Sequence, residues 1–128
     1  MNLYHIATRE AWSAAEGHGA YKPSSLTSEG FVHCSTGRQV MLVAKRFYAG
    51  QAGLVLLVIS AERLTSTLKW EHVPDDPASA QGKPGPAYPH VYGPINLDAV
   101  TEVLDFGPDP GGTFRAPAIV DREAGGNR

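Results

Sequence analysis

The order of apolar and polar residues along the chain predicts a mixture of strands and helices. Alternation with a period of two runs through residues 2–7, 31–35, 67–73 and 101–106, as in strands with one buried face. Residues 54–60 are almost all apolar, which predicts a strand buried on both faces. Apolar residues three and four positions apart predict helices over residues 9–16 and between residues 36 and 50. The fold class that follows is α+β, with five or six strands and two main helices.

Helix-boundary residues support this assignment. Thr8 can cap the first helix, which Gly17 would end. Thr36 and Gln39 fit a capping box at the start of the second helix, and Gly50 would end it.

Glycine and proline are concentrated in two stretches, which sets the expected domain boundary. Of 14 Gly and 10 Pro, nine fall within residues 74–94 and eight within 107–128. We therefore expect one globular domain over residues 1–106, with a long Pro/Gly-rich loop at 74–87, and a flexible C-terminal tail at 107–128. Because the loop lies between Glu71 and His90, it is expected to form a rim or lid of a site.

Composition excludes several classes of protein. No apolar run approaches the length of a membrane span, and the first residues lack a secretory signal pattern, so we expect a cytoplasmic protein without a membrane partner. The single cysteine, Cys34, cannot form an internal disulfide. With 11 basic and 13 acidic residues and no basic run, the chain has no signature of nucleic-acid binding. The oligomeric state stays open.

Polar side chains on the first two strands are candidates for a binding wall. His5 lies between apolar neighbours, and it either bonds to a backbone carbonyl in the core or orients a ligand hydroxyl or phosphate. His33 and Ser35 share a face just before a helix N-terminus, an arrangement suited to a phosphate. Alternatively, Ser35 only caps the helix and His33 bonds to backbone. Cys34 points the other way and is read as a small core residue.

Later in the chain, Glu71, His90 and Tyr92 carry further candidate chemistry. Glu71 is either a solvated carboxylate on an edge strand or one that stabilises a developing cation. His90 and Tyr92 lie in a segment stiffened by three Pro or Gly residues, where they either face a cleft or sit in an exposed turn. The histidines and Glu71 show no recognised metal-ligand spacing, so no metal is expected.

These residues also carry a family resemblance that covers about residues 2–106. The chain resembles a family of small bacterial proteins, domain-of-unknown-function family 952. The resemblance rests on residues 4–6, Trp12, residues 25–26, 29–35, Gln39, residues 70–71 and 89–100.

That family is remotely similar to the ADP-ribosyltransferase superfamily, which implies a split, mixed or antiparallel sheet that grips NAD in a cleft. The resemblance implies His5 on the first strand and His33 with Ser35 on the second as ligand-holding residues. It implies Glu71, or less well Glu102, as the catalytic acid, with His90 or Tyr92 as substitutes. Trp12 or Tyr92 would stack on the nicotinamide ring, and Gln39 joins the cofactor-binding set.

Three functions stand open on these grounds. The first is an ADP-ribosyltransferase-like enzyme that uses NAD or a related nucleotide as substrate. The second is a non-catalytic module that binds a small ligand. The third is a histidine-based or metal-assisted hydrolase.

Overall fold

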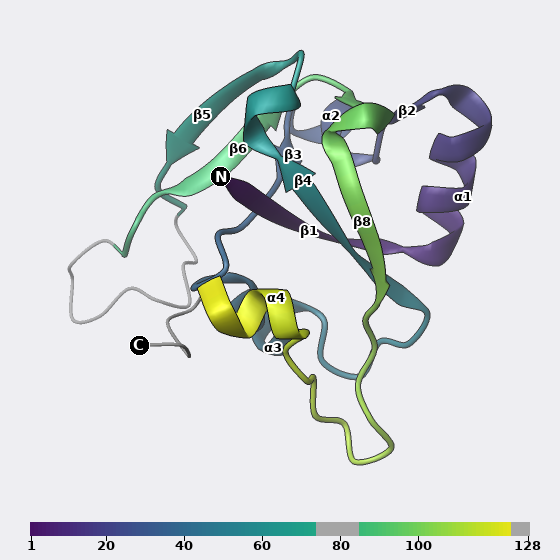
Figure 1. Ribbon diagram of the computed structural model, residues 1–128, viewed down its shortest axis with the longest axis vertical. Coiled ribbons are helices and arrows are strands. Elements are labelled where there is room, and N and C mark those ends of the chain that lie inside the picture. The colour runs from purple at the N-terminus through teal and green to yellow at the C-terminus, as the bar shows by residue number, and fades with distance from the viewer. Residues whose placement is uncertain (74–84, 124–128) are drawn as a thin grey trace.

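Eight strands form three antiparallel sheets in the computed structural model, which describes residues 1–73 and 85–123 (Figure 1). The first sheet has the order β1-β4-β8, the second pairs β2 with β7, and the third has the order β3-β6-β5. The strands are β1 (Asn2–Thr8), β2 (Ala20–Tyr21), β3 (Val32–His33), β4 (Leu54–Ser60), β5 (Thr67–Glu71), β6 (Tyr88–Tyr92), β7 (Ile95–Asn96) and β8 (Val100–Asp105). This arrangement confirms the α+β class.

The helices are short and flank the strands. They are α1 (Arg9–His18), α2 (Ser25–Ser28), α3 (Val40–Phe47) and α4 (Ala118–Asp121), with 3-10 turns η1 (Ala61–Arg63) and η2 (Leu97–Ala99). Among the described residues, no helix has the length and apolar character needed to cross a membrane.

The start of α1 is as predicted, but its end is not. The Thr8 hydroxyl accepts a hydrogen bond from the Ala11 amide at 3.0 Å, which confirms the cap. The helix passes through Gly17 and ends at Gly19, whose φ of 86° is the left-handed conformation that closes a helix. Gly17 was the wrong choice because a glycine ends a helix only where the chain adopts that conformation.

The start of α3 differs in part from a capping box. The Thr36 amide donates to Gln39 Oε1 at 3.0 Å, as the motif requires. However, residues 36–39 form a turn, and the helix begins at Val40 without a side-chain cap. Gln39 Nε2 instead donates to the Ala87 carbonyl at 2.9 Å, which joins this turn to the chain entering β6.

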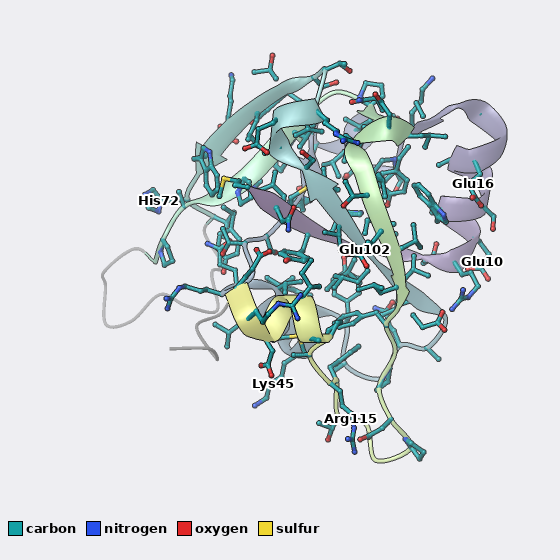
Figure 2. All side chains as sticks on the ribbon, viewed as in Figure 1. Glu10, Glu16, Lys45, His72, Glu102 and Arg115 are labelled. Carbon is teal, nitrogen blue, oxygen red and sulfur yellow. The ribbon has the colours of Figure 1, made fainter. Side chains whose placement is uncertain are left out.

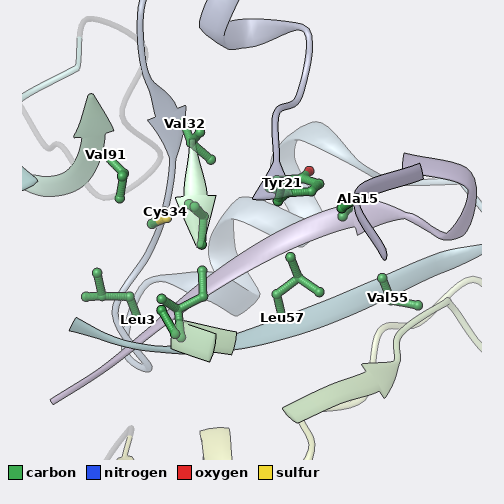
Figure 3. Close-up of a cluster of buried hydrophobic side chains, with 12 residues drawn as sticks. Leu3, Ala15, Tyr21, Val32, Cys34, Val55, Leu57 and Val91 are labelled. Atoms are coloured by element: carbon green, nitrogen blue, oxygen red, sulfur yellow. The ribbon is translucent and has the colours of Figure 1, made fainter. Parts of the chain in front are cut away.

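In the β1-β4-β8 sheet, β1 and β4 are buried on both faces, and β8 is largely exposed. Six of the seven residues of β4 are buried, as its apolar sequence predicts. Side chains at alternate positions of β1 and β4 belong to two separate core clusters, one of which is drawn in Figure 3. Leu3, Val55 and Leu57 lie in the first cluster, against α1 and β2, and Tyr4 and Leu56 lie in the second.

A short junction connects β1 to the end of β3 and so joins the first and third sheets. The Tyr4 amide donates to the Ser35 carbonyl and the Ser35 amide donates to the Tyr4 carbonyl, both at 2.8 Å. His5 Nδ1 lies 2.5 Å from the His33 carbonyl oxygen, and its Nε2 lies 2.7 Å from the Tyr21 hydroxyl. A carbonyl only accepts, so Nδ1 carries the proton and Nε2 of the neutral ring accepts from Tyr21.

The β3-β6-β5 sheet divides its side chains between the core and a cavity. Val32 and Val91 are cross-strand partners and belong to the first core cluster. On the next register position His33 pairs with His90, which pairs in turn with Lys69 of β5. The alternation predicted for residues 31–35 and 67–73 therefore holds, and β6, which the sequence analysis did not predict, lies between them. The polar face of this sheet carries the candidate site.

The segment after β8 differs from the loose tail expected from residue 107 onward. Phe114 stacks on Phe106 with ring centroids 5.2 Å apart, and Val120 of α4 is fully buried in the second core cluster. The glycine and proline content concealed these few apolar residues, which cover one face of the first sheet. Residues 124–128 of the predicted tail lie outside the described residues, as do residues 74–84 of the predicted loop and lid.

Replacing Val120 with alanine is expected to lower the free energy of unfolding by about 2 kcal/mol, because two buried methyl groups are lost. Urea denaturation measures this change. The exposed neighbour Asp121, changed to alanine, serves as control. A Val120→Ala variant as stable as the parent chain would contradict the packing of α4 on the core.

His5 is expected to make stability depend on pH. Burial lowers its pKa from 6.5 to about 4, so the unfolded chain takes up a proton before the folded chain does. The contribution of neutral His5 to the free energy of unfolding is therefore complete above pH 6.5 and is lost as the pH falls toward 4. Relative to a non-titrating His5→Gln variant, the parent chain should lose about 2 kcal/mol between pH 7.5 and 5. Parallel losses in both proteins, measured by urea denaturation, would contradict this role.

Candidate functional site

A cavity of about 710 Å³ lies on the polar face of the β3-β6-β5 sheet. Its other walls come from β1 and from α3 with the residue that follows it. The described lining residues are Tyr4, Ile6, Glu29, Phe31, His33, Cys34, Ser35, Val43, Phe47, Tyr48, Glu71, His72, Val73, Tyr88, His90 and Tyr92. The volume lies in the range of small-molecule sites, and the wall is mostly apolar and aromatic with a few polar groups.

Glu71 is the centre of a hydrogen-bond network in this wall. Its Oε1 accepts from the Tyr92 hydroxyl at 2.6 Å and from His90 Nδ1 at 2.8 Å. These two bonds hold the pKa of the Glu71 carboxyl below its ordinary value of 4.5, and the bond from Tyr92 has the larger effect. Its side chain is 37% exposed, so an ionised carboxylate is presented to the cavity at neutral pH.

His90 is fixed in one tautomer by this contact. Nδ1 donates to the Glu71 carboxylate, so in the neutral ring Nε2 is an unprotonated acceptor. The side chain is only 3% exposed, and Nε2 has no hydrogen-bond partner among residues 1–73 and 85–123. A buried acceptor without a partner is destabilising by about 1–3 kcal/mol, so this nitrogen calls for an explanation beyond packing.

Phe31 brings the polar residues of the wall together. Its ring stacks on His90, with centroids 4.2 Å apart and planes 20° from parallel. It also lies 4.7 Å from the His33 ring and 5.2 Å from the Tyr92 ring. His33 Nε2 is 2.9 Å from Glu29 Oε2, a second imidazole–carboxylate pair, which is about half exposed.

The lining residues that the structure describes include two carboxylates and no lysine or arginine. Two basic groups lie over rings of the wall. The Arg46 guanidinium is 5.1 Å from the centroid of the Phe47 ring. The Lys69 ammonium is 4.8 Å from the centroid of the Tyr92 ring. Its charge also lowers the pKa of Glu71, as a smaller cause than the hydrogen bonds.

Five of the sequence-predicted site residues meet at this cavity: Glu71, His90, His33, Ser35 and Tyr92. They come from all three strands of the β3-β6-β5 sheet and the residues just after β3. Their catalytic and binding roles stay predictions.

The structure does not bring His5, Trp12 or Gln39 to the described cavity wall. His5 projects to the face of β1 opposite Tyr4, and both of its nitrogens are bonded within the protein. Trp12 packs against the first core cluster, with its ring 6.4 Å from Tyr21. Gln39 is buried and bonded to backbone on both sides of its amide.

Glu102, the weaker candidate acid, is also elsewhere. It lies on β8 of the first sheet, opposite Val58 of β4, and is exposed. Figure 2 shows it well separated from His72, which follows β5 and lines the cavity. Of the two carboxylates considered from the sequence, only Glu71 lies in the described wall.

Several lining residues were not among the sequence-predicted set, notably Glu29, Phe31, Tyr48, His72 and Tyr88. Two had a usable signal: Phe31 shares the alternating face of His33, and Tyr88 shares that of His90. Glu29 precedes His33 by four residues and meets it only through the intervening turn. Tyr48 follows α3, and no pattern in the sequence relates it to the sheet.

Cys34 contributes little to the chemistry of the site. Cys34 is buried, and burial raises the pKa of its thiol to about 12, so the nucleophilic thiolate is not formed near neutral pH. In the described part of the chain, no three His, Cys, Asp or Glu side chains are grouped so as to hold a metal ion.

The chain matches the family model described as "Protein of unknown function (DUF952)" over residues 6–103. A comparison with curated proteins found no match. The crystal structure of protein CC0527 from Caulobacter crescentus is 31% identical, with 94% of this chain and 98% of that chain covered and a TM-score of 0.78. The solution NMR structure of the same protein is 33% identical, with coverages of 94% and 95% and a TM-score of 0.70. The chain therefore belongs to the DUF952 family.

Proposed function

We propose that the chain binds NAD or a related nucleotide in this cavity and transfers its ADP-ribose. The observation that carries the proposal is the ionised Glu71 carboxylate, held by Tyr92 and His90 in an aromatic wall. The resemblance to ADP-ribosyltransferases inferred from the sequence would make Glu71 the catalytic acid.

In the proposed reaction, the bond between ribose C1′ and the pyridine nitrogen breaks, and both electrons leave with neutral nicotinamide. Positive charge then develops on the ribose, and a carboxylate nearby stabilises it electrostatically. The acceptor forms a bond to C1′ and gives up a proton. His90 Nε2, the unprotonated nitrogen of the neutral tautomer, is the group suited to receive that proton.

The aromatic residues of the wall suit the binding half of this function. Phe31 and Tyr92 offer ring faces on which a nicotinamide ring can stack. His33 and Ser35 lie on the same side of the sheet and offer hydrogen bonds to ribose hydroxyls. Holding the ribose in this way fixes the reacting geometry before the bond breaks.

Incubation with NAD, with and without nucleophilic acceptors, is expected to release nicotinamide, which chromatography measures. Glu71→Gln should reduce the release rate about 100-fold, because the amide carries no charge to stabilise the transition state. Glu102→Gln, a matched change outside the described cavity wall, should leave the rate within about twofold. Equal losses in the two variants, or neither release nor binding of NAD by calorimetry, would rule out this proposal. Binding without release would instead favour the non-catalytic ligand module.

The charge of Glu71 is expected to persist in acid. Because hydrogen bonds lower its pKa, the carboxylate should stay ionised as the pH falls through 4.5 and be protonated only below that value. The Tyr92→Phe variant lacks the hydrogen bond that lowers the Glu71 pKa most, so the titration of Glu71 should move to higher pH. Carbon-13 NMR of the Glu71 carboxyl follows both curves. An unchanged midpoint in the variant would show that Tyr92 does not set this pKa.

A further inference from the structure

The described wall of the cavity has a charge pattern that favours cations. Glu29 and Glu71 both line it, and no lysine or arginine does so in the part of the chain that the structure describes. Glu71 uses Oε1 for both of its hydrogen bonds, and none is recorded from a described residue to Oε2. The Glu71 side chain is 37% exposed, so its carboxylate is accessible to a ligand at the cavity wall.

His90 adds an independent demand for a hydrogen-bond donor. Its side chain is 3% exposed, it lines the cavity, and its Nε2 has no partner among the described residues. Nδ1 already donates to Glu71, so in the neutral ring Nε2 can only accept. An N–H group of a ligand would satisfy this atom.

The rings around these groups favour a flat ligand. Phe31 and His90 stack with their planes 20° apart, so the wall already holds two planar groups face to face, and the Tyr92 ring, tilted by 42°, lies 5.2 Å from Phe31. The Lys69 ammonium over the Tyr92 ring shows that this aromatic wall also accommodates a positive charge. Guanidinium and amidinium groups combine planarity, positive charge and N–H donors in one plane.

We propose that the cavity recognises a planar organic cation with N–H donors, a guanidinium or amidinium, which pairs with Glu71 and donates to His90 Nε2. Bonds between such a group and a carboxylate are charge-assisted and stronger than neutral ones. The inference goes beyond ADP-ribose transfer, because it concerns recognition of charge and hydrogen bonding and needs no turnover of NAD.

Three probes of similar size test this recognition by calorimetry on the full chain without NAD. Phenylguanidine has charge and N–H donors, phenylurea has donors without charge, and phenyltrimethylammonium has charge without donors. Phenylguanidine is expected to bind at least tenfold more tightly than either of the others. Equal affinity for phenylurea would overturn the role of the carboxylates, and equal affinity for phenyltrimethylammonium would overturn that of His90.

Variants at Glu71 and at an exposed control residue locate the binding site without replacing a residue of the core. Glu71→Gln should weaken phenylguanidine binding at least tenfold. Glu16→Gln, the same change on the exposed surface of α1, should not alter it (Figure 2). Equal affinity in the two variants would overturn the assignment.

Nα-acetylarginine amide and ethylguanidine distinguish an arginine side chain from a free small molecule as the source of the cation. Phenylguanidine binding without nicotinamide release would contradict the ADP-ribose proposal alone, and release without this binding would contradict the cation proposal alone.

Discussion

The candidate site depends on the short junction between β1 and the end of β3. Two reciprocal backbone bonds at Tyr4 and Ser35, together with the His5 contact to the His33 carbonyl, fix where β3 lies against the first sheet. β6 and β5 follow from β3 by antiparallel pairing, so the junction sets the position of the whole third sheet. Because β3 has only two residues, its own pairing with β6 provides few bonds to resist a shift.

The junction also explains why the two faces of the third sheet differ. With β3 held at this position, Val32 and Val91 reach the first core cluster and are fully buried. The side chains of alternate residues must then point away from that cluster, toward β1 and α3, where the cavity lies. A shift of one residue in register would exchange these sets and place His90 in the apolar core. The buried valines thus fix the direction of the polar groups.

The sequence was informative where one local rule decides the structure. Alternation within residues 31–35 placed His33 and Ser35 on one face, and the apolar run of β4 predicted a strand buried on both sides. The sequence was less informative where contacts between two distant segments decide the structure. His5 shows the same strand pattern whether it faces a ligand or, as here, bonds to Tyr21 and to the His33 carbonyl, because those partners are set only by the packing of β2 and β3. Glu71 and Glu102 were likewise distinguished only by the sheet to which each strand belongs.

The composition of the cavity face is not what stability alone would favour. A buried imidazole whose Nε2 has no partner among the described residues destabilises the fold, and apolar residues at these positions would extend the core at no such cost. The three groups are nonetheless ordered: Tyr92 and His90 converge on one oxygen of Glu71, and Phe31 covers the His90 ring. Such an arrangement fixes a tautomer and keeps a carboxylate charged, two properties that matter to a bound ligand. Since residues that break local stability rules concentrate at functional sites, this network is the part of the chain that points most directly to function.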